Sequence, residues 1–353
     1  MLPARPAPLS SAEQRLVELG RGEPLHDEPH VVETPKPKPP TGLTRGVGDE
    51  ADRLLALGDL AIGRDDNAKA LEHYRQARRL LTGHPAPIVG IVNARFGLLG
   101  LPTQYAAAPK EKRLAELFQL LDDAQKLDPN YPQLALARGR LLLVKGDAPA
   151  AETQLQKAVA GLPDDAEAIS ELAIALLARG DVDGALEAFA HSSELDPNNP
   201  ERLTNLGTAW MLKADTTRAI EVFTRALSFA PEDPRALGNL GTALLAAGQV
   251  DSAIGQLTRA HELAPERATF MSNLGYAYHL KGDGPTAEDW CRRAVKADSK
   301  LGSAWINLGL VLAAKKQYGE AERAFKTAQK LDPTDPRALD NLEDLQTLRK
   351  SAP

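Results

Sequence analysis

The sequence predicts an all-α protein, a right-handed α–α superhelix or solenoid of about eight stacked helical hairpins closed by a C-terminal capping helix. The first observation is a row of prolines that recurs every 34 residues, with a serine in one slot. The row consists of Pro129, Pro163, Pro197, Pro231, Pro265, Ser299 and Pro333. A fixed period of this length is typical of helical repeats, in which each unit buries its apolar face against the next unit.

The second observation is that one period, residues 234–267, has the pattern of two helices. Pro234 can open the first helix at its first turn, and the pair Gly248–Gln249 interrupts the pattern before the second helix. Pro265 ends the second helix, because the residue before a proline is pushed out of the α region. The apolar positions at helical spacing are Leu237, Leu240, Leu244, Ala253, Leu257, Ala260 and Leu263.

The third observation is a glycine in the middle of most first helices, where it costs about 1 kcal/mol relative to alanine. It recurs at Gly58, Gly139, Gly207, Gly241, Gly275 and Gly309. Because this loss of helix stability recurs in most repeats, we expect the glycine to bring a compensating gain in packing. The gain would be the close approach of the second helix of the same hairpin. The matching small residues are Ala151, Ala185, Ala219, Ala253, Ala287 and Ala321, and the large residues that fill the remaining space are Leu155, Phe189, Phe223, Leu257 and Phe325.

This combination resembles the motif of the tetratricopeptide repeat family: Leu-Gly in the first helix, alanine, a large residue and alanine in the second, then proline. The matching units are 51–84, 132–165, 166–199, 200–233, 234–267, 268–301 and 302–335. Residues 85–131 are too long for one unit and are interpreted as a divergent hairpin with a loop inserted near 100–109. Residues 336–349 are predicted to form the cap, so that the superhelix spans 48–350. The resemblance implies a non-enzymatic scaffold.

Residues 1–47 differ in composition and are predicted to form a disordered leader. Prolines are frequent there, and the run from Pro35 to Pro40 favours an extended polyproline conformation. The exception is a short helix expected from Ser11 to Leu19.

The composition argues against several classes of function. A net charge of −6 disfavours nucleic acid as a partner, and no apolar run is long enough to insert into a membrane. Cys291 is the single cysteine, which excludes an internal disulfide and favours a cytoplasmic location. No phosphate-binding loop, nucleophile elbow or zinc-binding helix motif is present. We therefore expect no enzymatic activity, no cofactor and no metal site.

The candidate binding residues are asparagines that also recur every 34 residues, each directly before a leucine of the core. They are Asn205, Asn239, Asn273, Asn307 and Asn341. The resemblance implies that this side of the first helices lines the concave surface. An amide can pair with both the N–H and the C=O of an extended peptide. The row resembles the asparagine ladder in the helical-repeat domain of O-linked N-acetylglucosamine transferase, of which only the binding mode is implied.

Two interpretations of the asparagine row stay open. The amides either contact a peptide or only hydrogen-bond along the groove and to water. Thr208, Thr242 and Tyr276, three residues after an asparagine, face a similar direction and would add polar or stacking contacts to a peptide. The equivalent upstream residues are Ala137 and Glu171, so any ladder is confined to the C-terminal half.

The sequence thus predicts a scaffold or adaptor that holds an extended peptide, or a segment of a partner protein, in its concave groove. The alternative is an assembly subunit of a bacterial multiprotein machine that acts through helix faces and self-association. In that case the loop at 100–109 and Trp290 would be contact points, and the chain would form a homo-oligomer. Light scattering at several concentrations separates the two hypotheses.

Overall fold

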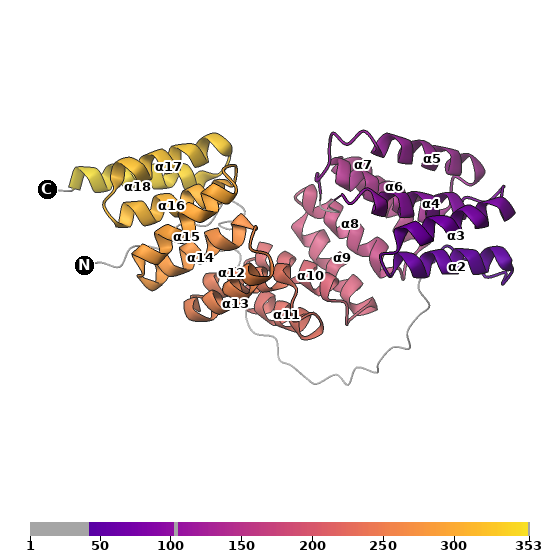
Figure 1. The fold of residues 1–353 in the computed structure, drawn as a ribbon, viewed down its shortest axis with the longest axis horizontal. Helices are drawn as coiled ribbons and strands as arrows, with labels where there is room; N and C mark the ends of the chain where they lie inside the picture. Colours follow the sequence, from indigo (N-terminus) through magenta and orange to yellow (C-terminus); the bar gives the residue numbers. More distant parts are fainter. Residues whose placement is uncertain (1–41, 102–104, 352–353) are drawn as a thin grey trace. The chain divides into compact units, whose positions relative to one another are not determined.

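The computed structural model describes residues 42–101 and 105–351, and in these residues all regular secondary structure is helical (Figure 1). The predicted all-α class of stacked hairpins is therefore confirmed. The proline-rich leader up to residue 41, including the helix expected from Ser11 to Leu19, lies outside the described residues.

The described residues divide into two compact units, one ending at Pro197 and the other beginning at Asn198. The N-terminal unit contains α2 (Glu50–Ile62), α3 (Asn67–Leu80), α4 (Ala86–Leu98), α5 (Leu114–Leu127), α6 (Pro132–Lys145), α7 (Ala148–Gly161), α8 (Ala166–Ala178) and α9 (Val182–Leu195). The C-terminal unit contains α10 (Pro200–Leu212), α11 (Thr216–Phe229), α12 (Pro234–Ala246), α13 (Val250–Leu263), α14 (Ala268–Lys281), α15 (Gly284–Ala297), α16 (Gly302–Ala314), α17 (Tyr318–Leu331) and α18 (Pro336–Ser351). Successive pairs, beginning with α2 and α3, form hairpins.

Each mid-helix glycine makes room for the large side chain that comes sixteen residues later, on the second helix of the same hairpin. A Cβ added to Gly207 would lie 2.6 Å from Cε1 of Phe223, and one added to Gly241 would lie 2.6 Å from Cγ of Leu257. The other pairs are Gly58 with Tyr74, Gly139 with Leu155, Gly275 with Cys291 and Gly309 with Phe325. The expected close approach is confirmed, and the large residue rather than the alanine takes up most of the space.

The alanines of the second helices are fully buried, as the packing argument requires. Ala219, Ala253, Ala287 and Ala321 all have an exposed fraction of 0%. The backbone carbonyl oxygen of Ala253 would lie 3.4 Å from a Cβ on Gly241, so the two helix backbones are close at this point. Small residues on the second helix and glycine on the first therefore act together to set the distance between the helices.

The hairpin of α4 and α5 has a long connection, and the described part of that connection is bonded to the end of α6. The backbone N–H groups of Ala106 and Ala108 donate to the carbonyls of Leu143 and Val144 at 2.9 and 3.0 Å. The Tyr105 hydroxyl donates to the carbonyl of Gly146 at 2.9 Å. These bonds are made to carbonyls at the C-terminal end of α6, where a helix leaves acceptors available, and the Leu143 carbonyl also accepts from the N–H of Gly146 at 2.9 Å.

Folded structure begins before residue 48, so the assignment of residues 42–47 to a disordered leader was wrong. Leu43 is 5% exposed and belongs to the core of the N-terminal unit. The cause is the carboxylate of Asp52, which accepts backbone N–H bonds from Arg45, Val47 and Gly48 at 3.0, 2.6 and 2.9 Å. The Arg45 guanidinium also pairs with Asp52 at 2.9 Å.

The glycine packing makes a prediction that two alanine substitutions test. Gly309→Ala places a methyl group against the ring of Phe325 and should lower the free energy of unfolding by about 1–3 kcal/mol. Gly255→Ala on α13, where nothing lies within 4 Å of the added Cβ, should raise it by up to about 1 kcal/mol. Urea unfolding followed by circular dichroism measures the free energy of unfolding of both variants. If the two substitutions change it equally, the close contact between Gly309 and Phe325 does not restrict the side chain at position 309.

A second prediction concerns the pH dependence of the N-terminal segment. Burial raises the pKa of Asp52, but the hydrogen bonds from Arg45, Gly48 and Val47 outweigh it and bring the pKa from 3.8 down to about 2. Because the folded pKa is lowered, the stabilisation is complete above pH 3.8 and is lost as the pH falls towards 2. The amide chemical shifts of Val47 and Gly48 should titrate with a midpoint near 2, whereas in Asp52→Asn they should not. A midpoint at or above 3.8 would show that these bonds do not favour the carboxylate.

Candidate functional site

The asparagine row lies on consecutive first helices of the C-terminal unit, one residue on each of α10, α12, α14, α16 and α18. These helices contact one another along the stack, α10 with α12, α12 with α14, α14 with α16 and α16 with α18. Four of the asparagines are half-exposed: Asn205, Asn239, Asn273 and Asn307. The fifth, Asn341, is only 6% exposed.

Two of the asparagine amides join neighbouring first helices through a threonine hydroxyl. Nδ2 of Asn239 donates to Oγ1 of Thr208 at 3.3 Å, and Nδ2 of Asn273 donates to Oγ1 of Thr242 at 3.0 Å. Each hydroxyl donates its own hydrogen to the carbonyl four residues earlier in its helix, at 2.9 Å in both cases. A threonine hydroxyl has one hydrogen, so its oxygen is left to accept the amide. The result is a repeated polar pair between residues that are 31 positions apart.

Tyr276 occupies the threonine slot of the next hairpin, and the following asparagine is bonded differently. Nδ2 of Asn307 reaches Oγ of Ser272 at 3.0 Å and the Ser272 carbonyl at 3.2 Å. The half-exposed Tyr276 ring lies beside His279, with ring centroids 6.4 Å apart, and burial lowers the pKa of His279. The row therefore changes from a hydroxyl to an aromatic group at this position.

The two ends of the row differ from its middle. Oδ1 of Asn205 accepts from Nη1 of Arg235 at 3.5 Å. Nδ2 of Asn341 donates to the carbonyl of Arg337, one turn earlier in its own helix, at 2.7 Å. Four amides thus lie half-exposed along one face of the C-terminal unit, and the amide of Asn341 is turned into its own helix.

In the N-terminal unit an ion pair takes the place of the amide and hydroxyl. Arg140 and Glu171 stand in the threonine and asparagine slots of their hairpins, 31 residues apart, and Nε of Arg140 donates to Oε1 of Glu171 at 3.2 Å. Arg140 also pairs with Glu167. Burial acts to lower the pKa of Arg140, but Glu167 and Glu171 raise it above its usual value. In the sequence, Glu171 is visible only as a residue that interrupts the row of asparagines, and its pairing with Arg140 cannot be seen there.

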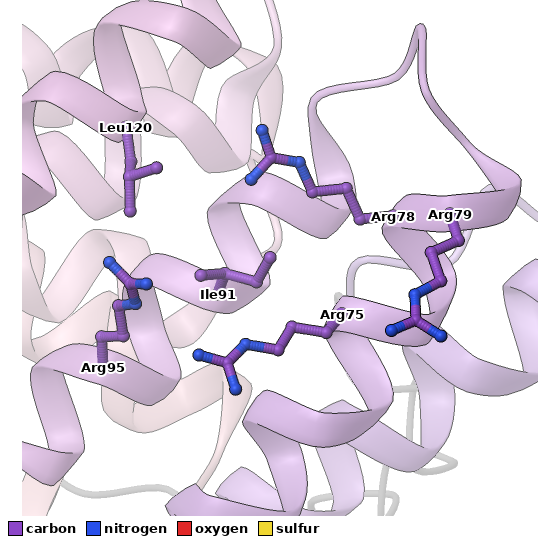
Figure 2. Close-up of a pocket in the computed structure, with 6 residues that line it drawn as sticks. All are labelled: Arg75, Arg78, Arg79, Ile91, Arg95 and Leu120. Atoms are coloured by element: carbon purple, nitrogen blue, oxygen red, sulfur yellow. The ribbon is translucent and has the colours of Figure 1, made fainter.

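A second feature that sequence reasoning missed is a recess of about 360 Å³ in the N-terminal unit, lined by four arginines and two apolar side chains (Figure 2). We call it the arginine recess, and its residues are Arg75, Arg78, Arg79, Ile91, Arg95 and Leu120. Figure 2 shows Arg75, Arg78 and Arg95 around Ile91, with Arg79 further out. A sequence signal exists, because residues 73–110 contain four arginines and one lysine but no aspartate or glutamate.

The remaining candidates do not form a catalytic or metal site in the part of the chain that the structure describes. Cys291 is buried, and burial raises the pKa of its thiol to about 12, so it packs as a small apolar group. Among the described residues, no three His, Cys, Asp or Glu side chains are grouped to hold a metal ion. Nor is any helix there both long and apolar enough to span a bilayer.

Sequence models of the tetratricopeptide repeat match residues 136–200, 170–236, 211–266, 239–301 and 302–335, which together run without a gap from 136 to 335. The chain belongs to the tetratricopeptide repeat family. Tetratricopeptide repeats support protein–protein interaction, so the chain is an interaction scaffold of a fold that is typically non-enzymatic.

Several solved structures are similar to most of the chain or to part of it. The Cut9–Hcn1 hetero-tetramer of APC/C matches at 18% identity with a TM-score of 0.65, over 85% of this chain and 57% of that chain. Our chain therefore spans little more than half of that one. YrrB, described as a tetratricopeptide repeat protein with an unusual peptide-binding site, matches at 23% identity with a TM-score of 0.40, over 53% of this chain and 96% of that one. A MamA fragment from Desulfovibrio magneticus RS-1 matches at 24% identity with a TM-score of 0.44, over 48% and 96%. No curated protein sequence matches the chain.

The repeated pair of asparagine and threonine predicts a measurable coupling between adjacent repeats. In a double-mutant cycle of Asn273→Ala and Thr242→Val, the coupling free energy should be about 0.5–1.5 kcal/mol, the net value of one hydrogen bond. The same cycle on Asn341 and Thr347, which share no bond in the structure, serves as the control and should give about zero. Chemical unfolding of the four proteins measures each cycle. No coupling between residues 242 and 273 would mean that the bond does not contribute to stability.

Proposed function

We propose that the C-terminal unit binds an extended segment of a partner protein in a concave groove along the asparagine row. The observation that carries this proposal is the set of four half-exposed amides, repeated on consecutive first helices and fixed by bonds to their neighbours. The proposed contact residues are Asn205, Asn239, Asn273 and Asn307, with Tyr276 beside them.

The hydrogen-bonding capacity of the amides supports this role. An asparagine amide has two N–H hydrogens and one oxygen with two lone pairs. In Asn239 and Asn273 the bond to threonine uses one hydrogen, so a second hydrogen and Oδ1 can serve a ligand. These are the two groups that pair with the C=O and N–H of a peptide backbone. Because the threonine already fixes the amide, binding costs little additional side-chain entropy.

The spacing of the row fits an extended chain. Packed helices lie about 8–10 Å apart, and an extended peptide advances about 3.3 Å per residue. Each asparagine would therefore address about every third ligand residue. Since the pairing uses the ligand backbone, the sequence of the ligand would matter little at these contacts.

The roles of the other predicted residues follow from the same bonds. Thr208 and Thr242 hold the asparagines, and their hydroxyl hydrogens are used within their own helices. We therefore assign them to positioning the amides and not to contacting the ligand. Tyr276 presents a half-exposed ring and supplies the stacking contact. Asn341, buried and bonded within its helix, adds little.

Two experiments test the proposal. One removes the four asparagine amides from the protein, and the other removes backbone N–H groups from the peptide ligand. An array of peptides of varied sequence is first screened with the full chain to find peptides that bind. A variant that lacks all four amides should keep the helical circular dichroism of the wild-type chain and bind those peptides about a hundredfold more weakly. It combines Asn205→Ala, Asn239→Ala, Asn273→Ala and Asn307→Ala. N-methylation at every third peptide residue should weaken binding by the wild-type chain in the same way.

The matched control carries four substitutions of exposed residues on the second helices of the same unit: Ser252→Ala, Glu262→Ala, Lys296→Ala and Lys330→Ala. It should bind the peptides as the wild-type chain does. Undiminished binding by the asparagine variant, or full tolerance of N-methylation, would refute backbone recognition by the row.

A further inference from the structure

We propose that the arginine recess of the N-terminal unit is a separate binding site for an acidic segment of a partner protein. Carboxylate or phosphate groups of that segment would pair with the guanidinium groups, and an apolar side chain would pack mainly on Leu120, with the buried Ile91 beneath it. This site is independent of the asparagine row, which lies in the other unit.

The recess collects positive charge from two helices. Arg75, Arg78 and Arg79 lie within two turns of α3, at positions i, i+3 and i+4, and Arg95 comes from the last turn of α4. Arg95 is half-buried and the other three are exposed. Like charges at i, i+3 and i, i+4 repel one another, whereas the C-terminal ends of α3 and α4 favour the positive charge of Arg78, Arg79 and Arg95. The two helix ends therefore help to hold several cations in one place.

No acidic side chain among the described residues is bonded to these arginines, and Glu72, three residues before Arg75, accepts a hydrogen bond from Gln76 instead. The structure gives Arg75, Arg78, Arg79 and Arg95 no ion pair or hydrogen bond from their side chains to any described residue. Most other arginines of the same unit have partners, for example Arg45 with Asp49, Arg113 with Glu111 and Arg138 with Asp122. The exposed Arg64 has none among the described residues, so what distinguishes the recess is that four such arginines lie together. The four guanidinium groups therefore keep their donors for an anion from outside the described residues.

The lining of the recess selects a segment of chain rather than a lone ion. Guanidinium groups bind carboxylates and phosphates through paired, charge-assisted hydrogen bonds. A volume of about 360 Å³ far exceeds the ~30 Å³ that one water occupies in the liquid, so several side-chain groups fit. Ile91 is only 3% exposed, so the apolar surface between the charges comes mainly from the half-buried Leu120, which suits a leucine or similar residue flanked by acidic ones.

A nucleic acid fits the molecule less well than an acidic peptide. The chain carries a net charge of −6, so a long polyanion would be repelled by much of the remaining surface. A short acidic segment needs only the local positive charge. The stretch 73–110, which lacks acidic residues, confines that charge to one place.

The experiment measures binding of a fluorescein-labelled peptide, in which glutamates flank a leucine, to the full chain by fluorescence anisotropy. A second peptide carries phosphoserines in place of the glutamates, and a third carries glutamines. The first two should bind with an affinity that falls as salt increases, and the third should not bind. Whichever of the two anionic peptides binds more tightly identifies the preferred anion.

The recess variant combines Arg75→Gln, Arg78→Gln, Arg79→Gln and Arg95→Gln. Its matched control removes the same charge at exposed residues of the same unit: Arg53→Gln, Arg64→Gln, Lys69→Gln and Lys157→Gln. The recess variant should bind the acidic peptides at least about tenfold more weakly, and the control should stay within about twofold of the wild-type chain. A variant with Arg75→Glu and Arg78→Glu should instead bind a fourth peptide, in which lysines replace the glutamates, which shows that the surface is still folded.

Three results would overturn the proposal. An equal loss of affinity for the acidic peptides in the recess variant and in the control would mean that binding depends only on the net charge of the chain. Undiminished binding of the glutamine peptide would exclude charge pairing. A single-stranded RNA oligonucleotide is tested in the same assay. If the wild-type chain binds it more tightly than both anionic peptides, and the recess variant no longer binds it, the recess is a nucleic-acid site.

Discussion

The contact between a glycine on the first helix and a large side chain sixteen residues later is the constraint on which the rest of the structure depends. It sets how closely the two helices of a hairpin approach, and so it sets the shape of each repeat. It tolerates partners of different size, because the large Tyr74, Phe223 and Leu257 and the small Cys291 all fill the same place. Since both members belong to one hairpin, the rule is satisfied locally and need not be specified by distant parts of the chain.

The polar rows are a consequence of that regular packing. Where one first helix stands in the same relation to the next, residues 31 positions apart meet, and where the large Tyr276 occupies that position Asn307 bonds to Ser272 instead. Asn239 meets Thr208 in one unit and Glu171 meets Arg140 in the other. The stack therefore offers a fixed set of neighbouring positions, and the residue types at those positions determine whether they join helices or are left to bind a ligand.

The sequence predicts the hairpins well because their signals are local and repeated: a proline after most second helices, a glycine in most first helices and alanines in the second. It predicts the positions of the asparagines but not their bonds, because the pairing of Asn273 with Thr242 depends on the distance between two helices. The arginine recess was missed for the same reason, since Arg75, Arg95 and Leu120 come from three helices. The early start of the fold at Leu43 depends on one carboxylate, Asp52, whose three backbone partners have no sequence signature.

The replacement of an amide pair by an ion pair in the N-terminal unit gives the two units different physical sensitivities. The attraction between Arg140 and Glu171 is screened by dissolved ions, whereas the bond between Asn273 and Thr242 joins neutral groups and is hardly affected by them. The desolvation cost of an ion pair also falls on heating. Two halves made from one repeating pattern can therefore differ in how their cohesion responds to the ionic medium and to temperature.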